Sequence, residues 1–563
     1  MVLNFLKKHK EILSLLVLAA IFFVVYLFLY WDVFRVGFNP PATEPPRLIF
    51  NQPDESVNYF FIKQLVLENR FSFPESLSDL ALSQVHPRST TVINGGIVPI
   101  GFPGFIILLS LILKVLIVMA GSVGFNLMAV MITPLIGVIA PFFLYGFLRR
   151  LFDQRLAWLS AVLMFILPPW WYYASRPFQH NVLFVFFVIL TLYFSAVFYE
   201  KREATNKYGT AFLMGLFFGL AIYVRPSEAV WLTIILASLI ILRRQFWHRR
   251  EYAGLAGALI LTAILFFATQ TAFYGHPLAS GYVRPDVSGA GGLITSGPQG
   301  IPILKAILVP FGFHPRVILH NLRGNFAHLF GFWSFLMLAG LVYWIFDIIK
   351  TRRRIPDSSF LIHYSSLFIF VSIYLLTYYG SWLFYDNLNQ QFSIGSSHVR
   401  YFLPIFVLAL PLVAGFLLWL WGRGPIVKSA VAILFLVMST TAYLSVFAQF
   451  EGLSTVKNTV KAYQIWQERV YSLTEKDAVI LTRYADKYIF PGRRVIVGWD
   501  NTERKQAIVN IIKDNKAVYY YDFKLTQAVG GEINNFLSAA EARLGPPLEN
   551  WNDLELRKVL PQK

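Results

Sequence analysis

The sequence predicts an all-α polytopic membrane bundle followed by a small α/β domain. Hydrophobic residues make up 56% of the 563-residue chain and charged residues only 14%, whereas a soluble domain carries about 25% charged residues. Apolar runs of about 20 residues, long enough to cross a bilayer as helices, recur up to residue 450. A transmembrane β-barrel would instead show alternating strands of about ten residues. From residue 451 the composition changes, which marks a second domain.

The basic residues indicate how the bundle is oriented. The formal charge is +18, and the lysines and arginines fall in short clusters between the apolar runs. Such clusters are typical of cytoplasmic loops. The charge excess is therefore mostly a topology signal, and we expect no nucleic-acid partner. The clusters are residues 7–10, 149–155, 200–207, 243–250, 350–354 and 422–428.

The first apolar run, residues 13–31, predicts an uncleaved helix with a cytoplasmic N-terminus. It follows a basic cluster, it is longer than the apolar core of a signal peptide, and no small-residue cleavage site comes after it. Residues 32–97 then form a long outside loop with a proline-rich start. Within this loop, residues 57–70 predict a helix that lies on the membrane.

Residues 98–120 are apolar enough to cross the membrane, but a crossing there would place every later basic cluster outside. We therefore expect a re-entrant or surface-lying element, which Pro99, Pro103 and Lys114 favour. The bundle then has about eleven spans and an outside C-terminus. After the first helix, the spans are residues 125–148, 156–173, 182–199, 209–224, 229–242, 253–273, 326–349, 360–379, 402–421 and 430–447.

Two domains follow from this division, a transmembrane domain of residues 1–450 and a soluble extracytoplasmic α/β domain of residues 451–563. The segments DAVILT, RRVIVGW and KAVYYYDF predict strands in the second domain, and residues 531–544 predict a helix. We expect the polar residues of its 483–487 stretch to be solvated surface. These are Arg483, Tyr484, Asp486 and Lys487.

Two adjacent acids, Asp54 and Glu55, follow Pro53 in the first outside loop. One interpretation is structural, because Pro-Asp-Glu before an apolar segment is a good helix start. The other is catalytic, because a carboxylate near the membrane can take the proton of an attacking hydroxyl. Adjacent side chains rarely point the same way, so we expect that only one of the two acids is the main catalytic group.

Three arginines on the outside face are candidates for binding a phosphate. Arg225 and Arg400 each stand where an apolar helix begins or ends, and Arg88 stands in the first outside loop. An arginine at membrane depth is costly unless it meets an anion or a polar cavity. Its fork of donors suits a phosphate ester, and a lipid-linked phosphate arrives at this depth. Interfacial snorkelling stays the alternative.

The sequence favours no metal centre. His86, His180, His314 and His398 fall outside the membrane, but no two of them have the three- or four-residue spacing of a helical ligand pair. The chain contains no cysteine, which excludes disulfides and thiolate metal sites. We expect no required cofactor. A divalent cation between Asp54 and a second acid stays an alternative.

The order of these features resembles the polytopic GT-C glycosyltransferases, the group that includes the protein O-mannosyltransferases and the lipid A aminoarabinose transferases. The resemblance covers roughly residues 4–447. It rests on the acidic pair in the first outside loop, an aromatic residue after it, and three later stretches in the same order. These are Asp54–Glu55, Tyr59, HPRS…GFPGF from His86, GLAIYVRP at 219–226 and HVRYFLP at 398–404.

The resemblance implies transfer of a sugar from a polyprenyl-phosphate donor to an acceptor hydroxyl on the outer face of the plasma membrane. It implies that Asp54 is the base, that Glu55 is a second acid, and that Arg400 holds the donor phosphate. A single base and an arginine suffice for direct displacement of phosphate, which inverts the anomeric centre. The candidate residues of the substrate cavity are Tyr59, His86, His180, His398 and Tyr401.

The chain departs from this family in the second outside loop. Many relatives carry an acid there, whereas SRPFQHN, residues 175–181, offers Gln179, His180 and Asn181. This difference favours a metal-independent site. The acceptor stays open between a protein, a glycan and a lipid.

Two other functions stay open. A transporter or lipid-linked-sugar flippase would show charges in the middle of its helices and two matching halves, and the sequence shows few such charges. A cell-wall or O-antigen polymerase or ligase would carry its functional loop late in the chain, where residues 274–325 could serve.

Overall fold

The computed structural model describes residues 10–33, 48–120, 124–200, 207–281, 309–351, 358–385, 387, 389–551 and 553–562. Most of the basic clusters 7–10, 200–207 and 350–354 and much of the 274–325 loop lie outside these residues. Contacts divide the chain into two compact units. The bundle unit takes its residues from Met1–Asn39, Leu127–Phe266 and Ser296–Val456, and the sheet unit from Pro40–Asn126, Phe267–Thr295 and Lys457–Lys563.

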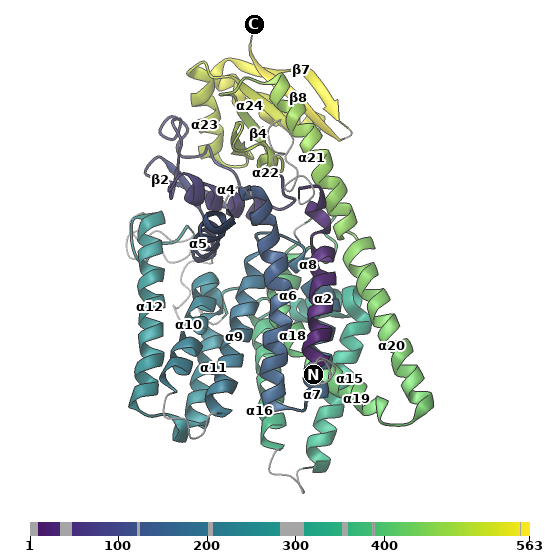
Figure 1. Cartoon of the computed structure of the whole chain (residues 1–563). Helices are drawn as coiled ribbons and strands as arrows, with labels where there is room; N and C mark the ends of the chain where they lie inside the picture. The colour runs from purple at the N-terminus through teal and green to yellow at the C-terminus, as the bar shows by residue number, and fades with distance from the viewer. Residues whose placement is uncertain are drawn as a thin grey trace. The chain divides into compact units, whose positions relative to one another are not determined.

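The bundle unit is built from helices, of which α9 and α10 pack closely against each other (Figure 1). Several helices are short, because a proline or a polar turn interrupts them. The helices are α2 (Lys10–Tyr26), α6 (Phe125–Leu151, from Leu127), α7 (Gln154–Ile166), α8 (Pro168–Ala174), α9 (His180–Glu200), α10 (Tyr208–Val224), α11 (Ala229–Leu242), α12 (Arg249–Tyr274, to Phe266), α14 (Pro315–Leu322), α15 (Leu329–Thr351), α16 (Ser358–Tyr378), α17 (Ser397–Tyr401), α18 (Leu403–Leu408), α19 (Leu410–Trp421) and α20 (Pro425–Tyr443).

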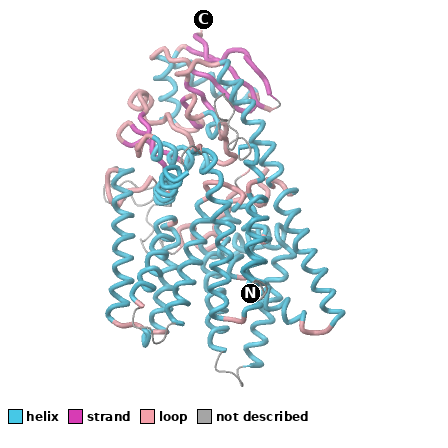
Figure 2. Tube along the Cα trace, viewed as in Figure 1, coloured by secondary structure: helices cyan, strands magenta, loops and turns pink. Residues whose placement is uncertain are grey.

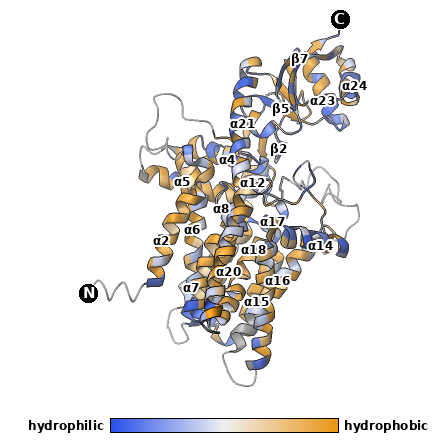
Figure 3. Cartoon of the chain, turned by 90° about the vertical axis from the view of Figure 1, so that its right-hand side faces the viewer, coloured by the Kyte–Doolittle hydropathy of each residue, from blue (hydrophilic) through white to orange (hydrophobic). Residues whose placement is uncertain are grey.

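The predicted multi-pass membrane character is confirmed by the length and apolarity of these helices. Among the described residues, 6 helices can cross a membrane, or up to 8 if each bent pair is one span. The bent pairs are α7 with α8, at 57°, and α10 with α11, at 119°. Figure 3 shows that hydrophobic residues dominate the helices of this unit. The count of about eleven spans stays a prediction.

The chain runs back and forth between two ends of the bundle unit. Arg150 near the end of α6, Glu200 at the end of α9 and Arg243 after α11 mark one end, the basic end. His180 at the start of α9 and Arg225 after α10 mark the other, the polar end. Because α9 has 21 residues, it separates the two ends by about 30 Å.

The sheet unit contains every strand of the described residues (Figure 2). Its larger sheet has the order β5-β4-β6-β8-β7. The first three of these strands in sheet order are parallel, and β8 joins antiparallel to β6 and β7. The strands are β4 (Val479–Thr482), β5 (Arg494–Val497), β6 (Val518–Phe523), β7 (Ala542–Trp551) and β8 (Leu554–Pro561).

Both faces of this sheet are buried, because alternate strand residues point to opposite sides. Val479, Leu481 and Tyr520 pack on one face with residues of α23 (Thr502–Lys513) and α24 (Gln527–Leu537). Ile480, Tyr519 and Tyr521 pack on the other with α21 (Leu453–Leu473) and α22 (Asp486–Ile489). The predicted α/β character of the C-terminal residues is therefore found as a three-layer arrangement.

The first outside loop is part of the same unit. Helix α4 (Pro53–Leu67) packs against α5 (Pro103–Ala120). A three-stranded antiparallel sheet of β1 (Phe73–Pro74), β3 (Gly96–Pro99) and β2 (Thr90–Ile93) lies between them in the chain. Asn94 and Gly95 form the two-residue turn between β2 and β3, with φ of 50° and 74°. An Asn-Gly pair favours this turn because both positions need positive φ.

Three sequence expectations differ in detail from the structure. The helix expected at 531–544 ends at Leu537, and its last residues belong to β7, because Glu541 adopts a left-handed conformation with φ of 51°. Residues 98–120 form an apolar helix only from Pro103, shorter than the six spanning helices. Residues 40–126 group by contacts with the C-terminal part, whereas the sequence places them with the bundle. The boundary at 450 and 451 stays a prediction.

Candidate active site

Helix α4 separates the roles of the two adjacent acids. Pro53 is its first residue, and the carboxylate of Glu55 accepts a hydrogen bond from the backbone N–H of Gln52 at 3.2 Å. Glu55 is fully buried, so it stabilises the start of the helix in the manner of a capping box. Asp54 is only half-buried, and it is the acid of this pair with the more accessible carboxylate.

A strained turn holds a hydroxyl against Asp54. Ser89 Oγ donates a hydrogen bond to Asp54 Oδ1 at 2.6 Å. Ser89 has a φ of 60°, a conformation that is uncommon for a residue with a side chain and that often occurs at functional sites. Its backbone oxygen accepts from Ile100 N–H at 2.9 Å, which fixes the turn beside the small sheet. The carboxylate of Asp54 is thus oriented before any substrate binds.

The other candidate residues of the first loop have defined places in the sheet unit. Tyr59 donates its hydroxyl to Asn126 Oδ1 at 2.7 Å, and burial raises the pKa of this hydroxyl. His86 Nδ1 lies 3.0 Å from the carbonyl oxygen of Pro87 and 3.2 Å from Thr90 Oγ1. Neither contact tests a role in the substrate cavity, which stays a prediction.

Arg88 already binds a carboxylate. Its Nε and Nη2 both donate to Asp486 Oδ1, at 2.9 and 2.6 Å, and its backbone N–H donates to Oδ2 at 2.8 Å. Asp486 is fully buried, so the expectation that it is solvated surface is wrong. The sequence could not show this ion pair, because 398 residues separate the partners. We therefore do not assign the donor phosphate to Arg88.

We expect the Arg88–Asp486 pair to hold the first loop on the α/β domain. Arg88→Ala leaves a buried carboxylate without its cation, so the detergent-purified protein should unfold at a lower temperature. A double-mutant cycle with Asp486→Ala should give a coupling energy of about 1–3 kcal/mol. The control is Arg469→Ala, which breaks a more exposed ion pair with Glu549 and should cost at most about 1 kcal/mol. Additive effects of Arg88→Ala and Asp486→Ala would contradict this role.

The polar end of the bundle unit brings together buried charged and amide side chains from three short segments of the chain. We call this set the polar cluster: Arg176, Gln179, His180, Asn181, Arg225, Glu228, Ser397, His398 and Arg400, all buried. Arg176 and Gln179 lie in the turn between α8 and α9, in which Phe178 has a φ of 63°, and His180 and Asn181 are the first residues of α9. The cluster contains three arginines and one carboxylate, so its net charge is positive. Such a buried excess suits an anion.

Arg400 lies in the middle of this set of interactions. Its Nη1 donates to Gln179 Oε1 at 3.2 Å, and its Nη2 donates to Ser397 Oγ at 2.8 Å. Its backbone oxygen accepts from Asn181 Nδ2 at 3.1 Å. Both of these side-chain partners are neutral. Arg400 thus joins the turn before α9 to α17 through polar side chains.

Arg225 has a carboxylate partner. Its Nη2 lies 2.8 Å from Glu228 Oε1, and both side chains are almost fully buried. Tyr379 joins them, since it accepts from Arg225 at 3.1 Å and donates to Glu228 at 2.6 Å. Glu228 offsets the charge of Arg225, although Nε and Nη1 of Arg225 meet no acceptor among the described residues. Arg225 can orient neighbouring groups but adds no net charge.

Tyr401 and His398 complete the described surroundings. The ring of Tyr401 stacks on Tyr379, with centroids 4.4 Å apart. The guanidinium carbons of Arg225 and Arg400 lie 5.1 and 5.6 Å from the Tyr401 ring centroid. His398 Nε2 lies 3.0 Å from the carbonyl oxygen of Trp382. The structure thus brings together the predicted residues His180, Arg225, His398, Arg400 and Tyr401.

No three His, Asp or Glu side chains lie together among the described residues in a way that could hold a metal ion. Metal independence stays a prediction.

Sequence reasoning missed several residues that lie beside the candidate residues of each unit. Glu228 stands three residues after Arg225, and this i, i+3 spacing could have predicted the ion pair. The serine of HPRS is Ser89, whose hydroxyl reaches Asp54. No local signal points to Tyr379, which lies 151 residues from Glu228.

Comparisons with known proteins agree with this fold. A family model described as dolichyl-phosphate-mannose-protein mannosyltransferase matches residues 103–267. ArnT from Cupriavidus metallidurans, solved with undecaprenyl phosphate, has a TM-score of 0.56 at 10% identity, over 98% of each chain. The oligosaccharyltransferase of Archaeoglobus fulgidus in the apo form has a TM-score of 0.51 at 15% identity, over 95% of this chain and 72% of that one. No curated protein sequence matches the chain.

Proposed function

We propose that this chain, which has the fold of GT-C type membrane glycosyltransferases, transfers a sugar from a polyprenyl-phosphate donor to an acceptor hydroxyl. The acceptor oxygen attacks the anomeric carbon, the bond from that carbon to the phosphate oxygen breaks, and the polyprenyl phosphate leaves. Asp54 takes the proton of the acceptor hydroxyl. Arg400 binds the donor phosphate and stabilises the negative charge that grows on it as it leaves.

The observation that carries this proposal is the excess of arginines over carboxylates among the buried residues of the polar cluster, at one end of a membrane bundle. Three buried arginines with one carboxylate among them are costly unless an anion binds beside them. A phosphate on a lipid chain can reach such a position from the bilayer, and ArnT, which has a similar fold, was solved with such a lipid. A nucleotide sugar is water-soluble and would not arrive from the bilayer.

The two acids have different parts in this proposal. Asp54 is accessible and held by Ser89, which fits a base that must meet its substrate. Glu55 stabilises the helix that carries Asp54. Arg225, Glu228 and Tyr379 form a fixed support for Tyr401, whose ring both arginines approach.

The proposal predicts inversion at the anomeric centre. One base and one leaving phosphate allow a single displacement, in which the acceptor enters opposite the phosphate. The purified protein should convert a synthetic polyprenyl-phosphate sugar into a product with the opposite anomeric configuration, measured by NMR coupling constants. Product that keeps the configuration of the donor would show a two-step reaction and exclude this mechanism.

We also propose that no divalent cation takes part, because the phosphate charge meets an arginine instead. Dialysis against EDTA, followed by assay with and without added Mg²⁺ or Mn²⁺, should leave turnover unchanged. A loss that Mn²⁺ restores would assign a metal to the acidic pair instead.

The alternative of a transporter or flippase has less support. The buried arginines lie at helix ends and in turns at one end of the bundle unit. A translocation pathway needs polar residues along the middle of the helices.

A further inference from the structure

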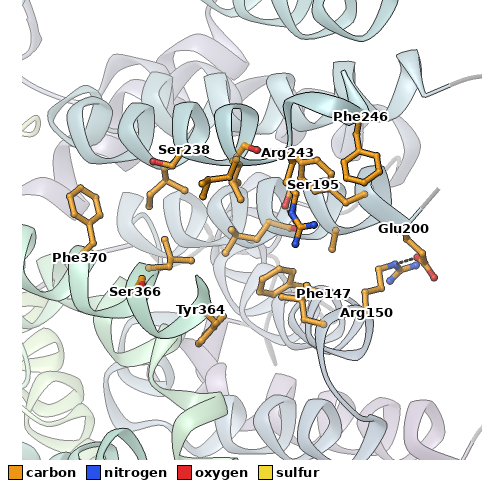
Figure 4. Close-up of a pocket in the computed structure, with 18 of the residues that line it drawn as sticks. Phe147, Arg150, Ser195, Glu200, Ser238, Arg243, Phe246, Tyr364, Ser366 and Phe370 are labelled. Atoms are coloured by element: carbon orange, nitrogen blue, oxygen red, sulfur yellow. Dashed lines mark hydrogen bonds and ion pairs between the residues drawn. The ribbon is translucent and has the colours of Figure 1, made fainter. Parts of the chain in front are cut away.

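The bundle unit has a cavity of about 550 Å³ that extends toward its basic end (Figure 4). It is lined by the C-terminal halves of α6, α9 and α11 and by the middle of α16. The charged end of the cavity, at Glu200, lies about 30 Å along α9 from His180 of the polar cluster, whereas Leu192 lies about 18 Å from His180. None of the lining residues belongs to the polar cluster. The cavity is therefore separate from the groups that the proposed sugar transfer uses.

The lining is apolar along most of its length and charged at one end. Leu192, Ile235 and Leu367 belong to the apolar part. Arg150, Glu200 and Arg243 lie toward one side of the cavity in Figure 4, and Phe370 lies toward the other. The lining is therefore complementary to an amphipathic ligand, whose apolar part would contact the apolar residues and whose polar head would lie at the charged end.

The charged end carries a net positive charge. Arg150 Nε lies 2.7 Å from Glu200 Oε2, and this pair is largely neutral. Arg243 adds a second guanidinium to the lining. Lys207 lies nearby, with its Nζ 5.6 Å from the centroid of Phe246, which also lines the cavity. The cavity therefore suits an anionic head group at this end.

The length of the apolar part fits one lipid tail. The lining residues of α11 run from Ile234 to Leu242, eight residues further on, which corresponds to about 12 Å. One leaflet of a bilayer has an apolar depth of about 15 Å, half of the hydrocarbon core. A chain that enters at the charged end thus stays within the leaflet on the side of the basic residues.

We propose that this cavity is a binding site for an anionic phospholipid of the leaflet on the basic side of the bundle. One acyl chain lies between α9, α11 and α16, and the phosphate of the head group meets Arg243. The ion pair of Arg150 and Glu200 closes the edge of the site, and Tyr199, which donates to the backbone oxygen of Leu239 at 2.8 Å, keeps α9 beside α11. The proposal does not depend on the sugar transfer proposed above.

The test is native mass spectrometry of the full-length protein, purified in detergent and titrated with dioleoyl phosphatidylglycerol. We expect Arg243→Glu to weaken binding of this lipid about tenfold or more, because it reverses a charge next to the phosphate. Ser238→Phe fills the groove from α11 and should have a similar effect. Two matched controls should bind normally: Arg249→Glu in the same basic cluster, and Ala237→Phe, which is exposed beside Ser238 but does not line the cavity.

Three further probes decide the class of ligand. Dioleoyl phosphatidylcholine has the same chains without net charge and should bind more weakly, and inorganic phosphate alone should not compete. Polyprenyl phosphate should not displace phosphatidylglycerol in a manner sensitive to Arg243→Glu. Any one of four results would overturn the proposal. These are equal binding of the two phospholipids, competition by inorganic phosphate alone, displacement of phosphatidylglycerol by polyprenyl phosphate, and an equal loss of binding in the control variants. Unchanged elution and unfolding temperature verify the fold, and if Ser238→Phe does not fold, Arg243→Glu decides alone.

Discussion

Replacing Asp54 by asparagine should lower the rate of sugar transfer by about 10²- to 10⁴-fold, the range that general base catalysis contributes. Asparagine keeps the size of the side chain and can still accept from Ser89 Oγ, so the turn should survive. It cannot take the proton of the acceptor hydroxyl. The measurement is the initial rate with a radiolabelled polyprenyl-phosphate sugar at saturating donor.

The neighbouring acid provides the matched control. Glu55→Gln keeps an oxygen for the backbone N–H of Gln52 and therefore keeps the start of α4. We expect this variant to retain most of its activity, whereas Glu55→Ala should destabilise the protein. Equal losses in Asp54→Asn and Glu55→Gln would contradict the separation of the two acids. Full activity of Asp54→Asn would remove the base from the mechanism.

Replacing Arg400 by alanine should lower kcat/KM for the donor by about 10²- to 10³-fold, as expected when one donor to a developing negative charge is lost. Because charge on the phosphate grows in the transition state, kcat should fall as well as kcat/KM. Arg400→Lys should recover part of the loss, since lysine keeps the charge but not the fork of donors. Steady-state kinetics with varied donor concentration separate the two constants.

A second arginine serves as the control for Arg400. Arg423, at the other end of the bundle unit, lies 4.4 Å from the centroid of Trp419 and takes no part in the polar cluster. Arg423→Ala should leave the kinetic constants unchanged. A loss in Arg400→Ala that appears only in the yield of folded protein would point to a structural role for Arg400 and contradict phosphate binding.

Much of the fold could be predicted because it depends on local patterns. Apolar runs of about 20 residues predict membrane helices, and segments such as RRVIVGW predict strands. The structure adds what local patterns do not contain. Residues 40–126 join the C-terminal residues in one unit, and Val85 even pairs with Ile496 by a β-bridge. Contacts between segments about 400 residues apart cannot be predicted from the local sequence pattern of either segment.

The candidate site shows the same division. The start of a helix at Pro53 is a local signal, and it correctly offered a structural explanation for one of the acids, Glu55. Asp54 accepts a hydrogen bond from Ser89 because Ser89 adopts a left-handed backbone conformation. The sequence around Ser89 does not predict this conformation. The sequence treats Arg88, Arg225 and Arg400 alike, whereas the structure gives carboxylates to the first two and amide and hydroxyl partners to the third.

The most direct test of sugar transfer is to follow the label and the lipid at the same time. The protein is reconstituted in liposomes with a polyprenyl-phosphate sugar labelled in the sugar, and acceptor, lipid and lumen are analysed separately. We expect label to leave the lipid and appear on an acceptor hydroxyl, with one polyprenyl phosphate released for each sugar moved, and no transfer by the Asp54→Asn protein. Label that crosses the bilayer while still attached to its lipid would contradict transfer and establish a flippase.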